Sequence, residues 1–538
     1  MTERSRSRTA HIIPNQYRDS VTLMQLSSTL MGLEGIDQAS VVVASSGNLD
    51  LLRGSGLLQG EIEATASDIV IAIEGWSDLL DGAVARAEEL LFEAKEKIDS
   101  NGSEAVAVRS ISAGMAADPG ANLALISTPG DYAAAEARKA VALGLDVMIF
   151  SDNVTEDDEI SLKQFASKRG RLVMGPDCGT AIINGIPLAF ANVVRRGPIG
   201  VVAASGTGLQ QVTSLIDRYG SGVSQAIGTG GRDLHANVGG VTMFAALRAL
   251  ESDPATEIVV LVSKPPAPSI AKRVVEAAER ATKPVVVNFL GPLAATERLG
   301  GVQFVRTLEE ASRAAVSLAI GSPFESGVRP PDELLSRTRL AVSRGVAGGF
   351  VRGLYSGGTF CYEALILIAE RIGEVYSNTP VDEAYRLENV WKSRGHCVVD
   401  LGDDEFTRGR PHPMIDHSIR NERIVAEAKD PAVGIVLFDV VLGHGSHADP
   451  AGAMIPALES ANRASCDRVV FIGSVCGTDA DPQNRRDQER RLESAGVILA
   501  DSNAQAAMLA AEAILASGGG GGEEGRRVPL GGAAKGVV

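Results

Sequence analysis

The sequence has no apolar stretch long enough to cross a membrane. Its longer apolar runs, such as residues 433–442, are broken by a charged side chain, here Asp439, and fall short of the roughly 18 to 20 residues that span a bilayer. The N-terminal MTERSRSRTA contains arginines, but the apolar core of a signal peptide does not follow it. We therefore expect no transmembrane helix and a cytoplasmic protein.

The sequence also has few cysteines and no net positive charge. The five cysteines are widely spaced and include no CxxC pair, which fits reduced thiols and excludes a disulfide framework or a zinc ribbon. Lys and Arg number 51 against 67 Asp and Glu, giving a net charge of -16, so the chain as a whole repels nucleic acids and anionic membranes. Small anionic molecules and partner subunits are the expected partners, and we expect an oligomer.

Strand-like and helix-like segments alternate through most of the chain, which predicts an α/β protein with parallel sheets. The first 105 residues differ. Strands at 11–14, 39–44 and 68–73 and helices at 19–33 and 81–98 are typical of a small α+β domain of the ferredoxin-like type. The polar residues 100–103 mark its end.

Three α/β blocks are predicted after this domain. Residues 120–197 have the strand, turn, helix and strand of a Rossmann-like domain, but their turn at Pro129 and Gly130 lacks GxGxxG, which argues against a nicotinamide dehydrogenase. Residues 198–320 and 350–516 form the second and third blocks, joined by a linker and helix at 321–349. The Gly-rich residues 517–538 predict a disordered tail.

Glycine accounts for 59 of the 538 residues, above the average of roughly 7%, and three glycine-containing loops follow buried strands. The free N–H groups and positive dipole of a helix N-terminus bind anions, and glycine lets an anion approach the backbone. The alternative is a plain βα turn with a Ser or Thr cap. No loop has the P-loop pattern GxxxxGK[ST]. The predicted anion-binding residues are Ser205, Gly206 and Thr207, then Gly357, Gly358 and Thr359, then Gly443 and Gly445.

Several motifs resemble CoA ligases. GPDCGTAIING, IGVVAASGTGLQQ, IGTGGRDL and TKPVVVNF look like the CoA-binding and first ligase domains of the succinyl-CoA synthetase α subunit, and DLGDDEFTRGRPHPMID with VVLGHGSHADPAGA looks like the ligase-type domain of the β subunit. Together with the N-terminal domain, almost the whole chain resembles the FdrA family of acyl-CoA-synthetase-like proteins. The resemblance implies a Rossmann-like CoA-binding-type domain at 120–197 and two succinyl-CoA-synthetase-like, flavodoxin-like domains at 198–320 and 350–516.

The chain departs from NDP-forming CoA ligases at two points. Those enzymes pass phosphate through a histidine in a glycine-rich loop, but residues 288–304, NFLGPLAATERLGGVQF, contain no histidine. The blocks described above leave no room for an ATP-grasp domain. ATP-driven CoA ligation by this chain alone is therefore not expected.

The resemblance also implies a geometry for the site. It places phosphate between two helix N-termini, here those predicted to open at Ser205 and at Gly443, and it adds Gly230 and Gly231 of the IGTGGRDL motif to the anion-binding residues. Two opposed dipoles would stabilise a phosphate or an acyl phosphate. FdrA-like proteins are also linked to oxamate carbamoyltransferase, whose chemistry needs an anion site but no phosphohistidine. CoA remains open as a cofactor, and no metal is expected.

Histidines are concentrated in the third block, where His444 and His447 follow a buried strand. Either could act as a general acid or base, since histidine titrates near pH 6.5, or could simply belong to a polar turn. HGSH lacks the helical spacing of a zinc site. Arg408 and Arg410 lie in a charged loop that is either a solvated connection or a grip for a carboxylate or phosphate. Cys178 and Cys476 lack the signature of an activated thiol.

Three hypotheses for function remain. The first is a subunit that handles acyl or carbamoyl phosphate, converting oxalurate and phosphate to oxamate and carbamoyl phosphate, with His444, His447, Arg408 and Arg410 in catalysis. The second is an acyl-CoA ligase whose nucleotide domain lies on another chain. The third is a CoA- or anion-binding regulatory subunit without catalysis, in which the N-terminal domain binds other proteins.

Overall fold

A computed structural model describes residues 5–516, except 17, 19, 61, 66, 100–107, 109, 292–297, 300, 344–348 and 409. The boundary expected at 100–103 and the tail expected at 517–538 lie outside the described residues. The chain divides into two compact units: residues 1–171 with 403–416, and residues 172–402 with 417–538. In the described residues no helix is long and apolar enough to span a bilayer.

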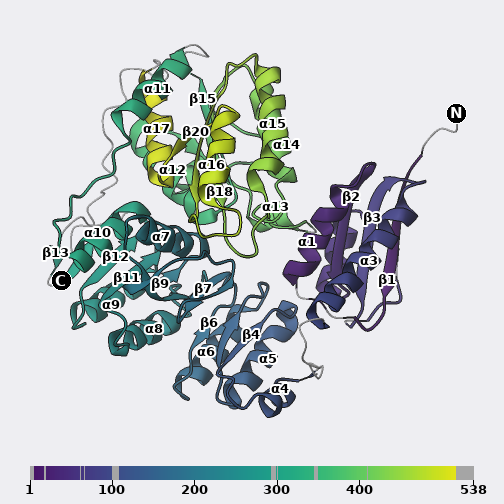
Figure 1. The fold of residues 1–538 in the computed structure, drawn as a ribbon, viewed down its shortest axis with the longest axis horizontal. Helices are drawn as coiled ribbons and strands as arrows, with labels where there is room; N and C mark the ends of the chain where they lie inside the picture. Colours follow the sequence, from purple (N-terminus) through teal and green to yellow (C-terminus); the bar gives the residue numbers. More distant parts are fainter. Residues whose placement is uncertain are drawn as a thin grey trace. The chain divides into compact units, whose positions relative to one another are not determined.

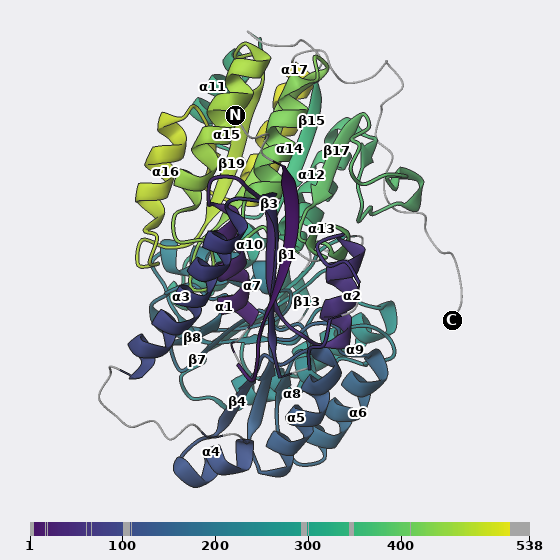
Figure 2. The ribbon, with the colours of Figure 1, turned by 90° about the vertical axis from the view of Figure 1, so that its right-hand side faces the viewer.

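The N-terminal part of the first unit is an antiparallel sheet (Figure 1) with helices on both faces (Figure 2). The strand order is β1-β3-β2. Alternate residues of β3 serve two cores: Ile69, Ile71 and Ile73 pack with α1 and α3, whereas Val70 and Ala72 pack with α2. The elements are β1 (Arg6–Ile13), α1 (Ser20–Met31), β2 (Ile36–Val43), α2 (Ser46–Gly54), β3 (Ile69–Trp76) and α3 (Leu80–Asp99).

This region confirms the predicted small α+β domain, with two differences. The first strand begins earlier than expected, and α2 was not predicted. A capping side chain marks the start of α2, because Ser45 accepts a hydrogen bond from the Asn48 amide. The second part of the first unit contains α4 (Ile111–Ala117), β4 (Leu123–Ile126), α5 (Gly130–Ala142), β5 (Asp146–Ile149), α6 (Glu156–Ser167) and α13 (Asp404–Thr407), with β4 and β5 parallel as predicted.

The second unit contains two α/β sheets (Figures 1 and 2). The first has the order β13-β14-β12-β11-β9-β10-β7-β8, and its central strands are parallel. The short β6 (Val173–Met174) precedes this sheet and is not one of its strands. The elements of this block are β7 (Thr180–Ile183), β8 (Ile186–Ala189), β9 (Arg196–Ala204), α7 (Gly206–Arg218), β10 (Val223–Gly228), α8 (Val241–Ser252), β11 (Ile258–Ser263), α9 (Pro268–Glu279), β12 (Val285–Phe289), β13 (Arg298–Leu299), β14 (Val302–Phe304) and α10 (Leu308–Ile320).

The other sheet of this unit is parallel throughout, in the order β16-β17-β15-β18-β19-β20. Every residue of β18 is buried, as a strand covered on both faces requires. The elements are α11 (Asp332–Ser343), β15 (Phe350–Tyr355), α12 (Gly358–Ile372), β16 (Val375–Tyr376), η1 (Glu383–Tyr385), β17 (His396–Asp400), α14 (Ser418–Lys429), β18 (Val433–Val441), α15 (Pro450–Ser465), β19 (Val470–Cys476), α16 (Arg485–Ser494), β20 (Ile498–Ala500) and α17 (Asn503–Ala516).

Both sheets reverse their winding direction at a strand that opens a glycine-containing loop. In the first sheet the chain passes from β9 to β10 on one side and later returns to β11 on the other; in the second, β17 and β18 flank β15 in the same way. Open α/β sheets bind ligands at the carboxyl ends of the strands beside such a switch point. The ends of β9, β11, β15 and β18 are therefore where a site is expected.

Candidate functional site

Helix α7 begins directly after β9, and its first turn is held by its own cap. The side chain of Ser205, in the extended conformation, accepts a hydrogen bond from the Gly208 amide at 2.9 Å. The amides of Gly206 and Thr207 have no acceptor in the described part of the chain. Two backbone donors at the positive end of a helix are thus available to an anion.

Helix α12 begins after β15 in a different way. Its cap residue, Gly357, has no side chain, and the amides of Ser356 and Gly357 both donate to the carboxylate of Asp439 at 2.8 Å. Among the described residues, the amides of Gly358 and Thr359 have no acceptor. The start of α12 therefore offers the same kind of donors as the start of α7.

The two helix starts meet. Ser205 Oγ and Thr359 Oγ1 are 2.6 Å apart, and a Cβ on Gly357 would lie only 3.0 Å from the methyl group of Thr207. Glycine at this point lets the two backbones approach each other. Two positive helix ends that face one another repel unless negative charge lies near them, so the junction favours an anionic ligand.

Lys264 and Asp400 flank the start of α12. Lys264 is the first residue after β11, and Asp400 is the last of β17. A Cβ on Gly358 would lie 3.1 Å from Lys264 Nζ and would overlap Asp400 Oδ2. Asp400 is held in place, since the Gly402 amide donates to its Oδ1 at 2.9 Å. The junction thus combines helix amides with one cationic and one anionic side chain.

The buried ion pair of Arg420 and Asp439 stabilises the start of α12. Arg420 is fully buried and donates to Asp439 Oδ1 at 3.1 Å and to Ser356 Oγ at 3.3 Å. Its Nη2 lies 2.7 Å from His417 Nδ1. Burial lowers the pKa of Arg420 even though Asp439 opposes this effect, and burial followed by the Arg420 charge lowers the pKa of His417 well below its usual range.

The helix expected at the third glycine loop begins elsewhere. α15 starts at Pro450 and is capped by Asp449, not by Gly443 or Gly445. The Gly443 amide donates to Gln483 Oε1 at 3.0 Å, and the His444 amide donates to the Ala191 carbonyl at 2.9 Å. No helix begins at Gly443, so the predicted pairing of the Ser205 helix with a helix there is wrong, and the helix start that meets α7 is that of α12. Anion binding by Gly443 and Gly445 stays a prediction.

The other residues of this loop take separate positions. His444 is exposed, and burial raises the pKa of the neighbouring Asp481 despite the hydrogen bonds that its carboxylate accepts. His447 accepts a hydrogen bond from the Asp449 amide through Nδ1 at 3.0 Å, and its ring lies 5.3 Å from that of His417. A catalytic role for His444 or His447 stays a prediction.

Gly230 and Gly231 contact another loop of the same sheet. Gly230 has a positive φ of +86°, and a Cβ there would overlap the Pro176 carbonyl oxygen. A Cβ on Gly231 would lie 3.9 Å from Asp177 Oδ2. Close backbone packing accounts for the glycine at 230, and anion binding by this pair stays a prediction.

Arg408 and Arg410 are exposed and belong to the first compact unit, beside the short helix α13. Their role in gripping a substrate carboxylate stays a prediction. Cys178 and Cys476 are buried, and burial raises the pKa of the Cys476 thiol. A buried thiol with a raised pKa is a poor nucleophile.

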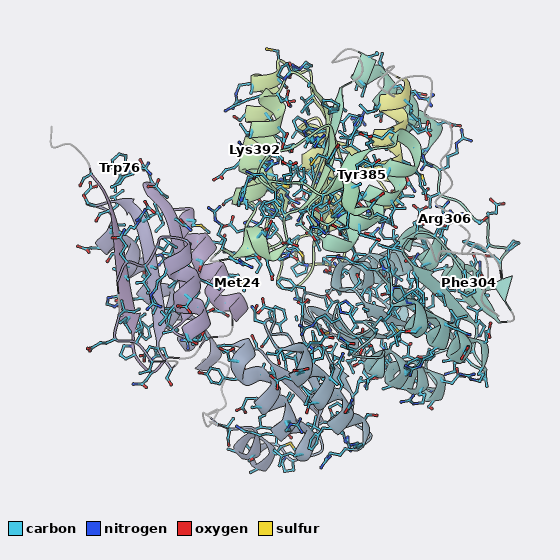
Figure 3. The ribbon with its side chains drawn as sticks, turned by 180° about the vertical axis from the view of Figure 1, so that it is seen from behind. Met24, Trp76, Phe304, Arg306, Tyr385 and Lys392 are labelled. Atoms are coloured by element: carbon cyan, nitrogen blue, oxygen red, sulfur yellow. The ribbon has the colours of Figure 1, made fainter. Side chains whose placement is uncertain are left out.

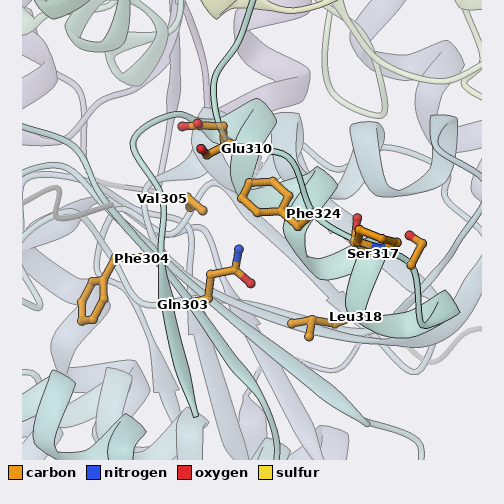
Figure 4. A pocket seen from close by; sticks show the side chains of 10 residues that line it. Gln303, Phe304, Val305, Glu310, Ser317, Leu318 and Phe324 are labelled. Atoms are coloured by element: carbon orange, nitrogen blue, oxygen red, sulfur yellow. The ribbon is translucent and has the colours of Figure 1, made fainter. Parts of the chain in front are cut away.

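One pocket, of about 380 Å³, lies between β14, α10 and the segment that follows α10 (Figure 4). Gln303, Phe304, Leu318 and Phe324 line it, together with Glu310. Glu310 serves the capping box of α10 with Thr307, so its carboxylate is occupied by helix capping. Among the described residues, the lining contains no histidine, cysteine or cation.

Three residues of the junction were not predicted from the sequence: Lys264, Asp400 and Asp439. Lys264 and Asp400 carry a signal that could have been used, because each is a charged residue at the end of an apolar run. Asp439 lies within such a run, and only the fold shows that it contacts residues 82 and 83 positions earlier in the chain.

Three family models match the chain. The model described as AllF, heavy metal-associated domain, matches residues 6–110; the CoA-binding domain model matches residues 195–291; and the CoA-ligase model matches residues 354–513. The last two confirm the CoA-ligase-like α/β fold class. The CoA-binding match falls in the block predicted to be the first ligase domain, and the CoA-binding role of residues 120–197 stays a prediction.

The residues present do not fit a heavy-metal site in the first unit. Residues 6–110 contain no cysteine, and their one histidine, His11, lies 2.8 Å from Glu88. Within the described residues, no group of three His, Cys, Asp or Glu side chains could hold a metal ion.

CoA is a better fit. Thr128 Oγ1, two residues after β4, is buried without a hydrogen-bond partner among the described residues, and the α7–α12 junction could take a phosphate group. The residues that would hold CoA are therefore Thr128 at the end of β4, or Gly206 and Thr207 at the start of α7.

Curated proteins similar to the chain include YahF and the α subunits of succinate–CoA ligases. The chain is 43% identical to the uncharacterized protein YahF of Escherichia coli, over 94% of this chain and 98% of YahF. It is 27% identical to the succinate–CoA ligase [ADP-forming] α subunit of Aquifex aeolicus over 27% of this chain, and spans about half the length of that subunit (49%). A solved structure, PH0766 from Pyrococcus horikoshii, aligns with 74% of this chain and 84% of its own, at 14% identity and a TM-score of 0.28.

The match with YahF covers almost the whole chain. It therefore spans all three regions matched by family models, the N-terminal domain, the CoA-binding block and the CoA-ligase block. The chain therefore belongs to the FdrA-like family of acyl-CoA-synthetase-like proteins, together with YahF.

Proposed function

We propose that this chain is a subunit that handles acyl or carbamoyl phosphate, and that its reaction is phosphate-dependent carbamoyl transfer, from oxalurate and phosphate to oxamate and carbamoyl phosphate. The observation that supports it is the junction of α7 and α12, where the side-chain oxygens Ser205 Oγ and Thr359 Oγ1, one at each helix start, lie 2.6 Å apart. Four amides without acceptors in the described chain, and the Lys264 ammonium nearby, suit a phosphate group.

The reaction balances without a nucleotide. A phosphate oxygen attacks the carbamoyl carbonyl carbon, a C–O bond forms, and the C–N bond to the oxamate nitrogen breaks. The proton released from phosphate returns to that nitrogen, so the products are carbamoyl phosphate and the oxamate amide. Helix amides and Lys264 would hold phosphate and stabilise the charge that develops on the carbonyl oxygen.

A proton donor for the leaving nitrogen completes the scheme. His444 and His447 lie after β18, beside the switch point of the second sheet, and either could supply the proton. Arg408 and Arg410 belong to the other compact unit, and their predicted grip on a substrate carboxylate stays a prediction. The chain would act with partner subunits in an oligomer.

The test is phosphate-dependent release of carbamoyl phosphate from oxalurate by the chain with its partner subunits. Lys264→Met should remove this activity, whereas Lys392→Met, an exposed lysine between β16 and β17 (Figure 3), should not change it. Labelled nucleoside triphosphate should leave no stable label on the purified chain, because residues 288–304 contain no histidine. An acid-labile phosphohistidine would contradict the proposal.

An acyl-CoA ligase that works with a separate nucleotide-binding chain is the second candidate. The CoA-binding and CoA-ligase family matches favour it. When bound, CoA would supply the thiol that accepts the acyl group. Formation of acyl-CoA from acid, CoA and ATP by the reconstituted complex, without release of carbamoyl phosphate from oxalurate, would decide for this candidate.

A further inference from the structure

His417 is a buried histidine whose tautomer the structure defines. It is 3% exposed, stands at the start of α14, and its Nδ1 lies 2.7 Å from Arg420 Nη2. A guanidinium can only donate hydrogen bonds, so Nδ1 accepts. The neutral ring must then carry its proton on Nε2.

Within the described part of the chain, that proton has no acceptor. His417 Nε2 is buried without a hydrogen-bond partner among the described residues, and so is the hydroxyl of Ser446, whose side chain is 7% exposed. Ser446 precedes His447, whose ring centroid lies 5.3 Å from that of His417. Buried donors are nearly always satisfied in folded proteins, so two such donors on neighbouring segments indicate an acceptor that comes with a ligand.

The position of these donors relates them to the anion site. Arg420 connects His417 to Asp439 and Ser356, which hold the start of α12. Ser446 lies in the loop after β18, the strand beside β15 at the switch point of the sheet. The donors thus belong to the same end of the sheet as the amides of Gly358 and Thr359.

The chemistry of His417 differs from that expected of His444 and His447. Burial and the neighbouring Arg420 charge lower its pKa well below the usual range, so it stays neutral at physiological pH. It is unsuited to exchanging protons with a substrate, but a neutral N–H in a fixed tautomer is suited to recognising an oxygen atom.

We propose that His417 Nε2–H, with the hydroxyl of Ser446, forms a subsite for a carboxylate or carbonyl oxygen of the acyl or carbamoyl substrate, beside the phosphate site at α7 and α12. The identity of this ligand rests on the proposed function, whereas the two unpaired donors do not. His417 is then a substrate-binding residue that gives no proton to the reaction.

Two substitutions separate substrate binding from structure. Asn in place of His417 keeps an oxygen near the Nδ1 position for Arg420 but removes the Nε2 donor; Gln places an amide N–H near the Nε2 position. We expect His417→Asn to weaken oxamate binding by about 10- to 100-fold and to leave phosphate affinity within about twofold. His417→Gln should restore most of the oxamate affinity. Melting temperatures of both variants check that they are folded.

A direct measurement uses the unaltered protein with ¹⁵N-labelled histidine, in complex with its partner subunits. The His417 resonances, assigned with the Asn variant, should show the neutral Nε2–H tautomer at neutral pH, as the lowered pKa requires. Saturating oxamate should shift the Nε2–H signal, and phosphate alone should not.

Three outcomes overturn the subsite. The first is an Nε2–H signal that stays unchanged while oxamate binds, the second is an equal response to phosphate alone, and the third is an Asn variant that binds oxamate normally. Each would show that the His417 Nε2–H group does not bind oxamate. If oxamate does not bind but acyl-CoA forms from acid, CoA and ATP, the carbamoyl proposal fails by itself. The same spectra with succinate as the probe then decide the subsite.

Discussion

The starts of α7 and α12 both leave two backbone amides free in the described chain, but they are capped in different ways. α7 is capped locally, by Ser205 bonding to an amide three residues later. α12 is capped by Asp439, more than 80 residues away, which is itself paired with the buried Arg420. The comparison shows that two equivalent helix ends can differ greatly in what they depend on: one on a single hydroxyl, the other on the packing of a whole sheet.

The largest effect is expected from removing the remote cap. Asp439→Asn leaves the fully buried Arg420 without its carboxylate and should lower the free energy of unfolding by about 3 to 5 kcal/mol. Urea unfolding measures this. Asp501→Asn, which removes an exposed partner of Arg218, should cost only about 0 to 1 kcal/mol.

The double variant Asp439→Asn with Arg420→Met sharpens this prediction. Because the buried charge is then gone as well, the loss should be smaller than for Asp439→Asn alone. Equal losses in the single and double variants would show that Arg420 does not depend on Asp439.

The middle of α12 also depends on a buried carboxylate, that of Glu363. In α7, the corresponding contact to α10 is a hydrogen bond from the Ser312 hydroxyl to the Val212 carbonyl. Burial raises the pKa of Glu363 to about 7, against hydrogen bonds from the Leu308 amide and Asn503. A raised carboxyl pKa means that the folded state binds the proton more tightly. The contribution of Glu363 to stability should therefore be greatest below about pH 4.5 and fall by about 3 kcal/mol as pH rises to about 7, with no further loss above.

Unfolding measured from pH 4.5 to 8 tests this dependence. Glu363→Gln should remove most of the slope, and the exposed control Glu374→Gln should retain it. A slope that survives in Glu363→Gln would place the titrating group elsewhere.

The next effect concerns the phosphate that we propose to bind at both helix starts. Lys264→Met should raise the phosphate dissociation constant by about 10- to 100-fold, the usual value of a hydrogen bond to a charged group, and leave the melting temperature unchanged. Isothermal titration with phosphate measures it, with Lys392→Met as the control. Equal phosphate affinity in the Lys264 variant would show that the α7–α12 junction is only a packing contact.

The parts of this site that depend on neighbouring residues were predictable, and those that depend on the packing of distant segments were not. Ser205 and the glycines at 357 and 358 follow apolar runs, and the structure places them at helix starts as expected. The pairing of α7 with α12 and the cap from Asp439 arise from strand order, which no local pattern encodes. The start of α15 was mispredicted although Asp449 and Pro450 form an ordinary cap followed by proline; the preceding glycines suggested an earlier start.

The smallest effect is expected at the local cap, and it separates capping from anion binding. Ser205→Ala removes the hydrogen bond to Gly208 and the contact with Thr359, and should cost about 1 kcal/mol of unfolding free energy. Ser205→Asp keeps an oxygen that can cap α7, so its stability should stay close to that of the unaltered protein. Its carboxylate, however, stands between two helix starts where phosphate would bind, so phosphate affinity should fall much further in Ser205→Asp than in Ser205→Ala. Urea unfolding and phosphate titration on the same two variants measure both quantities. If the Asp variant bound phosphate as well as the Ala variant, Ser205 would be a cap alone, and the two helix starts would share a contact without sharing a ligand.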